Sequence, residues 1–332
     1  IFISVVFFSI SEILIYQSGF LIFTFLLFVF WLKKDKTIMF YDHAYFVLLI
    51  MFLTLLSSIY FVSFVDSHAA RIIVRTSDLA KEYTSNNVGG YGFVYTCLLI
   101  LPAIFFEMRK QYRLKNNFKL SFLILFFLLA CSFIFLGGYT IALAGLLLAL
   151  LLLVPLFKRR IILFGLLTLP IGLIIFLGDG LIYLMPSFAL DLLEGTSYNT
   201  QLKSIIFYDP NDLVVNDSFE VRRERYLRSF NIFLDNFFTG KFDFNSVGKH
   251  STILDLSAMY GIFFISFFFL LLFRYLQFLY YSSGSRLVLV TGYLFTYIIM
   301  LNNLVPHFAA VLFILLPSLV KNNQEKDTQI LN

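Results

Sequence analysis

Charged residues are scarce in this sequence, and cysteine is nearly absent. Only 14% of the 332 residues are charged, whereas 60% are hydrophobic and the mean hydropathy is +0.87. A soluble domain has an apolar share of roughly 45–50%, so this composition excludes an ordinary soluble protein. The two cysteines, Cys97 and Cys131, fall inside long apolar runs, which excludes a disulfide framework and a cysteine metal site.

Several catalytic and binding signatures are missing as well. The sequence has no phosphate-binding glycine loop, no nucleophile elbow of the α/β-hydrolase type and no cluster with metal-ligand spacing. The net charge of +5 raises the question of nucleic-acid binding, but no basic patch is interleaved with aromatic residues on a soluble domain. We therefore expect no cofactor, no metal and no nucleic-acid partner.

Long apolar runs are what the sequence has in abundance. Runs such as Leu120–Leu136 and Ile141–Phe157 approach or reach the length needed to cross a hydrocarbon core of about 30 Å. Backbone groups inside lipid must pair within their own segment, so continuous runs predict α-helices rather than a β-barrel. The sequence predicts an all-α integral membrane protein of about ten transmembrane helices. Their ranges are 1–16, 19–32, 44–62, 91–107, 119–136, 140–157, 161–178, 253–273, 286–301 and 307–320.

Basic residues in the short connections predict the orientation of these helices. The connections at 33–36, 109–119 and 158–160 are rich in Lys and Arg and lie on one side by parity, so they should be cytoplasmic. The turns at 137–139 and 302–306 carry no basic residue and lie on the other side. Both termini are then cytoplasmic.

The same count divides the chain into three parts. Residues 1–178 hold transmembrane helices 1–7 and an external loop at 63–90. Residues 179–250 form one long external loop that contains helices. Residues 251–332 hold helices 8–10 and a cytoplasmic tail.

The long external loop contains a predicted helix over residues 219–238. Its aromatic residues fall on one stripe at helical spacing: Phe219, Tyr226, Phe230, Phe233 and Phe237. The same predicted helix contains four arginines within a stretch of seven positions: Arg222, Arg223, Arg225 and Arg228. Guanidinium groups donate paired hydrogen bonds to phosphate oxygens, so the cluster indicates a diphosphate site. The alternative is a solvated helix face on which the arginines pair with Glu220 and Glu224.

His250 ends the long loop at the point where the chain re-enters the membrane. An imidazole in this position could accept a proton from a sugar hydroxyl near neutral pH. Of the other histidines, His43 lies near the cytoplasmic surface, whereas His68 and His307 are predicted outside and remain alternatives. The alternative role for His250 itself is structural, as a residue that anchors the following helix.

Residues 222–262 contain Arg222, Tyr226, Gly240, His250 and Gly261 at spacings that resemble the pattern of the O-antigen polymerase/ligase superfamily of integral membrane enzymes. In that pattern an arginine is followed four residues later by an aromatic residue, then by a glycine turn, a histidine and a closing glycine. The corresponding residues here are Arg222, Tyr226, Gly240, His250 and Gly261. The chain is most similar to a repeat-unit polymerase for O-antigen or capsule.

The chain departs from the family pattern at two positions. The family often has Ser-Arg where the chain re-enters the membrane after the fifth helix, whereas this chain has Gly137-Gly138-Tyr139-Thr140. Phe237 replaces the usual proline before the glycine turn. The first departure shifts the expected substrate-binding role to Arg71 or Arg75 in the loop at 63–90.

The resemblance implies a membrane glycosyltransferase of the bacterial inner membrane, which we expect to be metal-independent. It implies a polyprenyl-diphosphate-linked oligosaccharide donor and a lipid-linked acceptor on the outer face, with a flippase and a chain-length regulator as partners. His250 and Arg222 are the expected catalytic residues. The expected substrate-binding residues are Arg225, Arg228, Arg71, Arg75 and Tyr226. Two alternatives stay open: a ligase that transfers O-antigen to lipid A–core, and a flippase for lipid-linked oligosaccharides.

Overall fold

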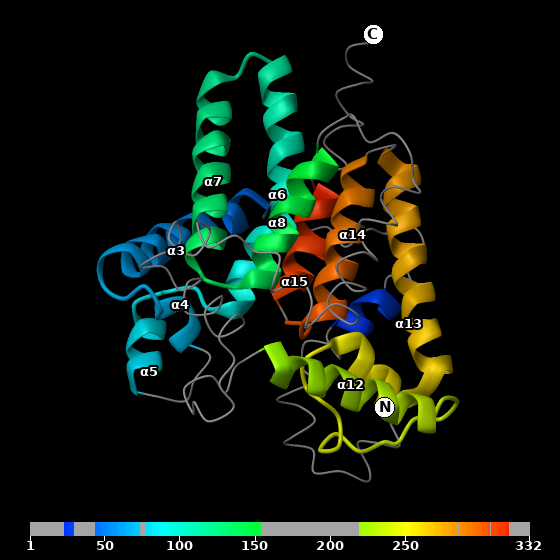
Figure 1. Cartoon of the computed structure of the whole chain (residues 1–332). Coiled ribbons are helices and arrows are strands. Elements are labelled where there is room, and N and C mark those ends of the chain that lie inside the picture. The colour runs from blue at the N-terminus through cyan, green and yellow to red at the C-terminus, as the bar shows by residue number, and fades with distance from the viewer. Residues whose placement is uncertain are drawn as a thin grey trace. The chain divides into compact units, whose positions relative to one another are not determined.

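The computed structural model describes residues 23–29, 44–73, 78–153, 219–283, 286–305 and 307–318. In these ranges the chain forms helices joined by turns and no β-strand (Figure 1), which confirms the predicted all-α class for this part of the chain. The predicted spans 1–16 and 161–178 lie outside the described residues, as do positions 179–218 of the long loop. Of the predicted span 19–32, positions 23–29 are described and are helical.

Four helices in the described ranges are long and apolar enough to cross a membrane. They are α3 (Ala44–Phe64), α6 (Tyr91–Arg113), α7 (Asn117–Leu136) and α13 (Thr252–Ser283). Shorter apolar helices follow the remaining predicted spans of these ranges: α8 (Thr140–Leu153), α14 (Arg286–Leu301), and α15 (His307–Ala309) with the π-helix η4 (Ala310–Leu315). The chain is therefore an α-helical membrane protein.

The chain divides into two compact units. The first contains Ile1–Phe52, Leu99–Phe127 and Ser229–Asn332, and the second contains Leu53–Leu98 and Leu128–Arg228. The division passes through α3, α6, α7 and the helix α12 (Phe219–Asp235).

In the first unit, α13 and α14 pack side by side (Figure 1). The core beside them is aromatic: the ring centroid of Phe23 lies 4.9 Å from that of Phe295 and 5.1 Å from that of Phe313. The hydroxyl of Tyr275 on α13 donates to the carbonyl of Leu312 in η4 at 2.5 Å. Large buried rings supply much of the packing energy of a core, so these contacts hold the C-terminal helices against α13.

In the second unit, the predicted loop at 63–90 folds back onto α3. It contains the short helices α4 (Ala69–Ile72) and α5 (Asp78–Ser85). The hydroxyl of Tyr83 donates to Asp66 Oδ2 at 2.9 Å, and this hydrogen bond raises the pKa of Tyr83. The hydroxyl of Ser58 on α3 accepts a hydrogen bond from the N–H of Gly89 at 2.7 Å. These contacts give the segment a defined fold of its own.

Candidate functional site

The helix predicted at 219–238 is present as α12, which ends at Asp235. The helix ends before Phe238, and the chain turns over residues 236–239. The N–H of Gly240 donates to the carbonyl of Asn236 at 2.8 Å in this turn. The buried face of α12 differs from the predicted aromatic stripe. Ser229 is fully buried, whereas Phe230 and Phe237 are exposed. The aromatic spacing therefore predicted the helix correctly, but the helix packs through a face centred on a serine.

Two glycines of the sequence pattern, Gly240 and Gly261, each lie against the backbone that immediately precedes the other. Gly261 interrupts α13 with φ 72° and ψ −177°, and Gly240 has φ 73°. A Cβ atom on Gly261 would lie 2.2 Å from the carbonyl oxygen of Phe238, and one on Gly240 would lie 2.2 Å from that of Met259. Both positions thus require glycine for conformation and for space.

Backbone hydrogen bonds fasten the loop after α12 to the break in α13. The N–H of Lys241 donates to the carbonyl of Ala258 at 2.9 Å, and the N–H of Ile262 donates to the carbonyl of Phe237 at 2.8 Å. In an unbroken helix such groups pair with residues one turn away. An unpaired backbone group costs several kcal/mol in lipid, so the loop supplies the partners that the break at Gly261 removes.

The side chain of Asp255, in the first turn of α13, organises the segment that precedes this helix. Its Oδ1 atom accepts a hydrogen bond from the hydroxyl of Ser229 on α12 at 2.5 Å and from the N–H of Lys249 at 3.3 Å. Its Oδ2 atom accepts from the N–H of Ser251 at 3.3 Å. Asp255 is buried, so these donors take the place of water.

The hydroxyl of Ser229 has a second role, because it accepts a hydrogen bond from the N–H of Gly248 at 2.8 Å. Ser229 and Asp255 together hold residues 248–251 against both α12 and α13. His250 lies in the middle of this segment and is half-buried. The candidate base is thus carried by a backbone that two helices fix in place.

Lys249, next to His250, has φ 63°, which non-glycine residues rarely adopt. Its contacts hold it there. The side-chain amide of Asn303 donates to the carbonyl of Lys249 at 3.0 Å. The Nζ atom of Lys249 lies 4.4 Å from the ring centroid of Phe244 and 3.2 Å from Asn245 Oδ1. Strained backbone of this kind costs of order 1–3 kcal/mol and persists only where the surroundings enforce it.

The turn after α14 meets the start of α13. The N–H of Thr252 donates to the carbonyl of Asn302 at 3.1 Å, and the hydroxyl of Thr252 accepts from the N–H of Leu304 at 2.5 Å. The hydroxyl of Ser251 donates to the carbonyl of Met300. These contacts bring the turn at 302–306 and the end of the long loop together, and the side of the membrane on which they lie stays a prediction.

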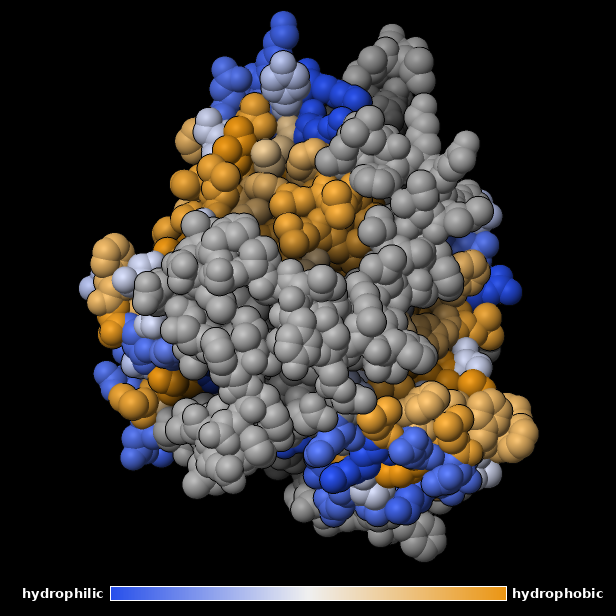
Figure 2. Space-filling model, in the orientation of Figure 1, coloured by the Kyte–Doolittle hydropathy of each residue, from blue (hydrophilic) through white to orange (hydrophobic). Residues whose placement is uncertain are grey.

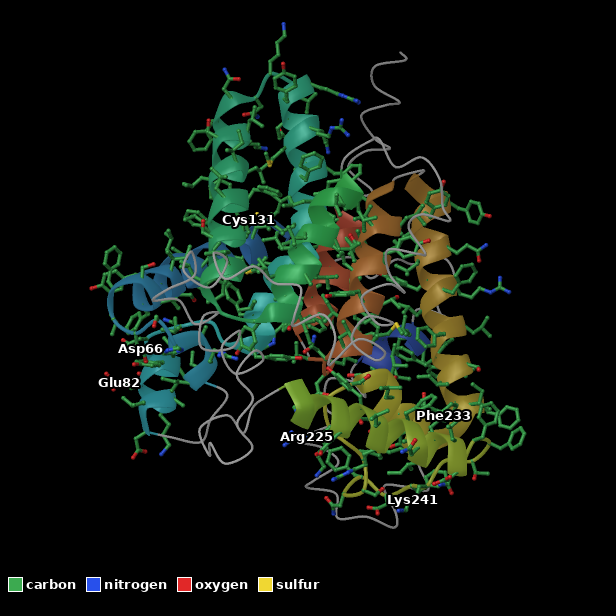
Figure 3. All side chains as sticks on the ribbon, viewed as in Figure 1. Asp66, Glu82, Cys131, Arg225, Phe233 and Lys241 are labelled. Atoms are coloured by element: carbon green, nitrogen blue, oxygen red, sulfur yellow. The ribbon has the colours of Figure 1, made fainter. Side chains whose placement is uncertain are left out.

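The arginines of α12 have different surroundings. Arg225, which Figure 3 labels on α12, is half-buried and Arg228 is exposed, whereas Tyr226, the aromatic residue of the pattern, is half-buried. Arg222 and Arg223 lie within α12, but their side chains are outside the described part of the structure. Binding of a diphosphate by any of these residues stays a prediction.

Arg71, in the second unit, lies beside Tyr139, which belongs to the turn at 137–139. Its guanidinium carbon is 5.8 Å from the ring centroid of Tyr139, and the hydroxyl of Tyr139 donates to the carbonyl of Ala70 at 3.0 Å. A guanidinium near the face of a tyrosine ring gains a cation–π attraction. The structure therefore places an arginine beside Tyr139, and a substrate-binding role for Arg71 stays a prediction. Arg75 is outside the described residues.

Sequence reasoning did not identify Asp255 or Ser229. Asp255 carried a signal, because it is an ionisable residue near the start of an otherwise apolar run, and such residues in membrane segments are often functional. Ser229 carried none. Of the alternative histidines, His68 precedes α4 and its N–H donates to Asp66, and His307 begins α15 and is exposed. In the described ranges, no three or more His, Cys, Asp or Glu residues are grouped as a metal site would require.

Comparison with known proteins returns no relative. No protein-family model matches the chain, and neither a curated protein nor a solved structure matches it. The resemblance of residues 222–262 to the O-antigen polymerase/ligase superfamily therefore stays a prediction, and the chain is identified by its architecture as an α-helical membrane protein.

Proposed function

We propose that the chain is a membrane glycosyltransferase that polymerises lipid-linked polysaccharide repeat units. The observation that carries the proposal is the anchoring of His250. Its backbone segment is tied through Asp255 to α13 and through Ser229 to α12, the helix that bears the clustered arginines. A half-buried histidine on a segment that is hydrogen-bonded to the arginine-bearing helix suits proton transfer beside an anionic leaving group.

In the proposed reaction, His250 accepts the proton of an acceptor hydroxyl while that oxygen attacks the anomeric carbon of the donor glycan. The bond between this carbon and the polyprenyl diphosphate breaks, and the diphosphate leaves with the bonding electron pair. Arg222, with Arg225, stabilises the negative charge that develops on the diphosphate. Arg71 is the further guanidinium that we assign to substrate binding.

A direct test of His250 uses purified lipid-linked repeat units as both donor and acceptor, in excess EDTA. A general base contributes about 10²–10⁴-fold to a rate, so His250→Asn should lower turnover by about that factor while donor binding stays near that of the native chain. Full turnover by His250→Asn would remove His250 as the base and direct attention to His68 or His307. Loss of wild-type turnover in EDTA would refute a metal-independent reaction.

The role of Arg222 is tested by comparing lysine with alanine at this position. A lysine ammonium is a point charge and does not reproduce the bidentate fork of a guanidinium, so Arg222→Lys should lose polymerisation almost as fully as Arg222→Ala. Arg223→Ala is the matched control, because it removes a neighbouring arginine from another face of the same helix. Equal activity of Arg222→Ala and the native chain would assign the cluster to a solvated face.

The surface glycan of a strain that lacks this gene distinguishes the proposal from its alternatives. Lipid A carrying single repeat units is expected for loss of a polymerase. Absence of all long glycan from lipid A would indicate a ligase instead, and accumulation of lipid-linked units on the cytoplasmic side would indicate a flippase.

A further inference from the structure

The C-terminal half of α12 presents three different faces to its surroundings. Ser229 marks the buried face. At about 100° per residue, Phe230 and Leu234 lie to one side of it, and both are exposed although they are apolar. Asn231 and Asp235 lie farther round and are exposed and polar. A helix that contacts only protein and water needs one face buried against protein and one polar face toward water. The exposed apolar face therefore indicates contact with something other than water.

The exposed apolar face continues into the turn after α12. Phe238 follows Leu234 by one helical turn and is 63% exposed. Its ring stacks on that of Phe263, with 5.9 Å between centroids and 30° between planes, and Phe263 is 70% exposed. The hydrogen bond from Ile262 to Phe237 fixes this corner, because it joins the turn to the backbone of α13.

From Phe263 the apolar surface runs along α13. Phe267, Leu270 and Phe273 are exposed and follow Phe263 at spacings of four, three and three residues, so they form one stripe on this helix. Because α13 is long and apolar enough to cross a membrane, this stripe faces lipid. Figure 2 shows the apolar surface in orange at the lower right, directly above a band of polar side chains in blue.

We propose that α12 lies in the membrane–water interface and that its corner is inserted among phospholipids. Phe230, Leu234 and Phe238 contact the boundary between headgroups and acyl chains, and the polar face with Asn231 and Asp235 faces water. The occupant of the patch is lipid rather than protein, because the patch is continuous with the lipid-facing stripe of α13. Helices with one apolar and one polar face bind membranes in this way, buried about 5–10 Å deep.

The inserted corner also sets the depth of the segment that carries His250. Gly248 is hydrogen-bonded to Ser229, so residues 248–251 stay at the level of α12. That level is the one at which the diphosphate of a membrane-anchored carrier lies. This consequence rests on the proposed function, whereas the lipid contact of α12 does not.

Site-specific fluorescence tests the lipid contact. The chain has one tryptophan, Trp31, so Trp31→Phe provides a background for single tryptophans at Phe238, at Asp235 on the polar face and at Leu270 within α13. Each variant is reconstituted in phosphatidylcholine vesicles with and without acyl-chain-brominated phosphatidylcholine. Tryptophan at 238 should emit at shorter wavelength and lose emission to the brominated lipid, as should tryptophan at 270. Tryptophan at 235 should lose emission to aqueous iodide.

Two results would overturn the proposal. Quenching of tryptophan at 238 by iodide, without quenching by brominated lipid, would place the corner in water. Quenching by neither reagent would show that protein covers the patch, as in contact with a second copy of the chain. Phe230→Trp repeats the measurement eight residues earlier, about two helical turns, in the event that the variant at 238 does not fold.

Discussion

The hydrogen-bond network of Ser229 makes the sharpest prediction about the stability of the site. Ser229→Ala removes a donor to Asp255 Oδ1 and leaves the buried N–H of Gly248 without its acceptor. An unsatisfied buried donor costs about 1–3 kcal/mol, and the lost hydrogen bond to a carboxyl group adds about 1 kcal/mol or more. We expect Ser229→Ala to lower the free energy of unfolding by about 3 kcal/mol.

Reversible unfolding by SDS in mixed micelles measures this loss. Ser257→Ala is the matched control, because Ser257 is also buried but its hydroxyl only donates to the carbonyl of Ile253 within its own helix. Such local hydrogen bonds add little stability, so the control should stay within about 0.5 kcal/mol of the native chain. If Ser229→Ala were as mild as Ser257→Ala, the network would not hold the segment.

A double-mutant cycle measures the coupling energy between Ser229 and Asp255. Asp255→Asn keeps one oxygen acceptor but places an amide donor opposite the N–H of Lys249 or Ser251, so it should also destabilise the chain. Residues in one hydrogen-bond network show coupling energies of about 0.5–3 kcal/mol. We expect the double variant Ser229→Ala/Asp255→Asn to cost less than the sum of the single variants. Strict additivity would refute direct coupling.

Two further predictions concern the backbone and the topology. Gly261→Ala should abolish stable insertion or activity, because the new Cβ atom would overlap the carbonyl of Phe238 at a position with positive φ. Gly292→Ala should be milder, since the nearest neighbour of its new Cβ atom is the end of a flexible leucine side chain. Equal expression and stability of the two variants would contradict the packing at the break. In a chain without its native cysteines, a cysteine at position Ser197 should react with an impermeant thiol reagent from outside and one at Asn116 should not. Labelling of position 116 from outside would reverse the orientation.

Much of the helical architecture could be predicted from the sequence, because each apolar run satisfies its own backbone hydrogen bonds inside lipid and needs no information from the rest of the chain. The predicted spans within the described ranges are helices in the structure, including those at 44–62, 91–107, 119–136 and 253–273. The helix at 219–238 was predictable for a similar reason, since its aromatic spacing is a local periodic signal. The pattern also contained Gly240 and Gly261, without indicating that they meet.

The tertiary structure alone decided which residues hold the candidate site together. Ser229 and Asp255 are separated by 26 positions, and nothing in the local sequence of either one names the other. Their partnership depends on how α12 packs against the first turn of α13, and that packing places a serine, rather than the predicted aromatic stripe, at the centre of the buried face. The close approach of Gly240 and Gly261 has the same origin, because only a break in α13 at Gly261 exposes carbonyls and N–H groups that the loop after α12 can bind. Periodicity therefore determines elements, whereas contacts between elements determine which polar groups are buried and which partners they find.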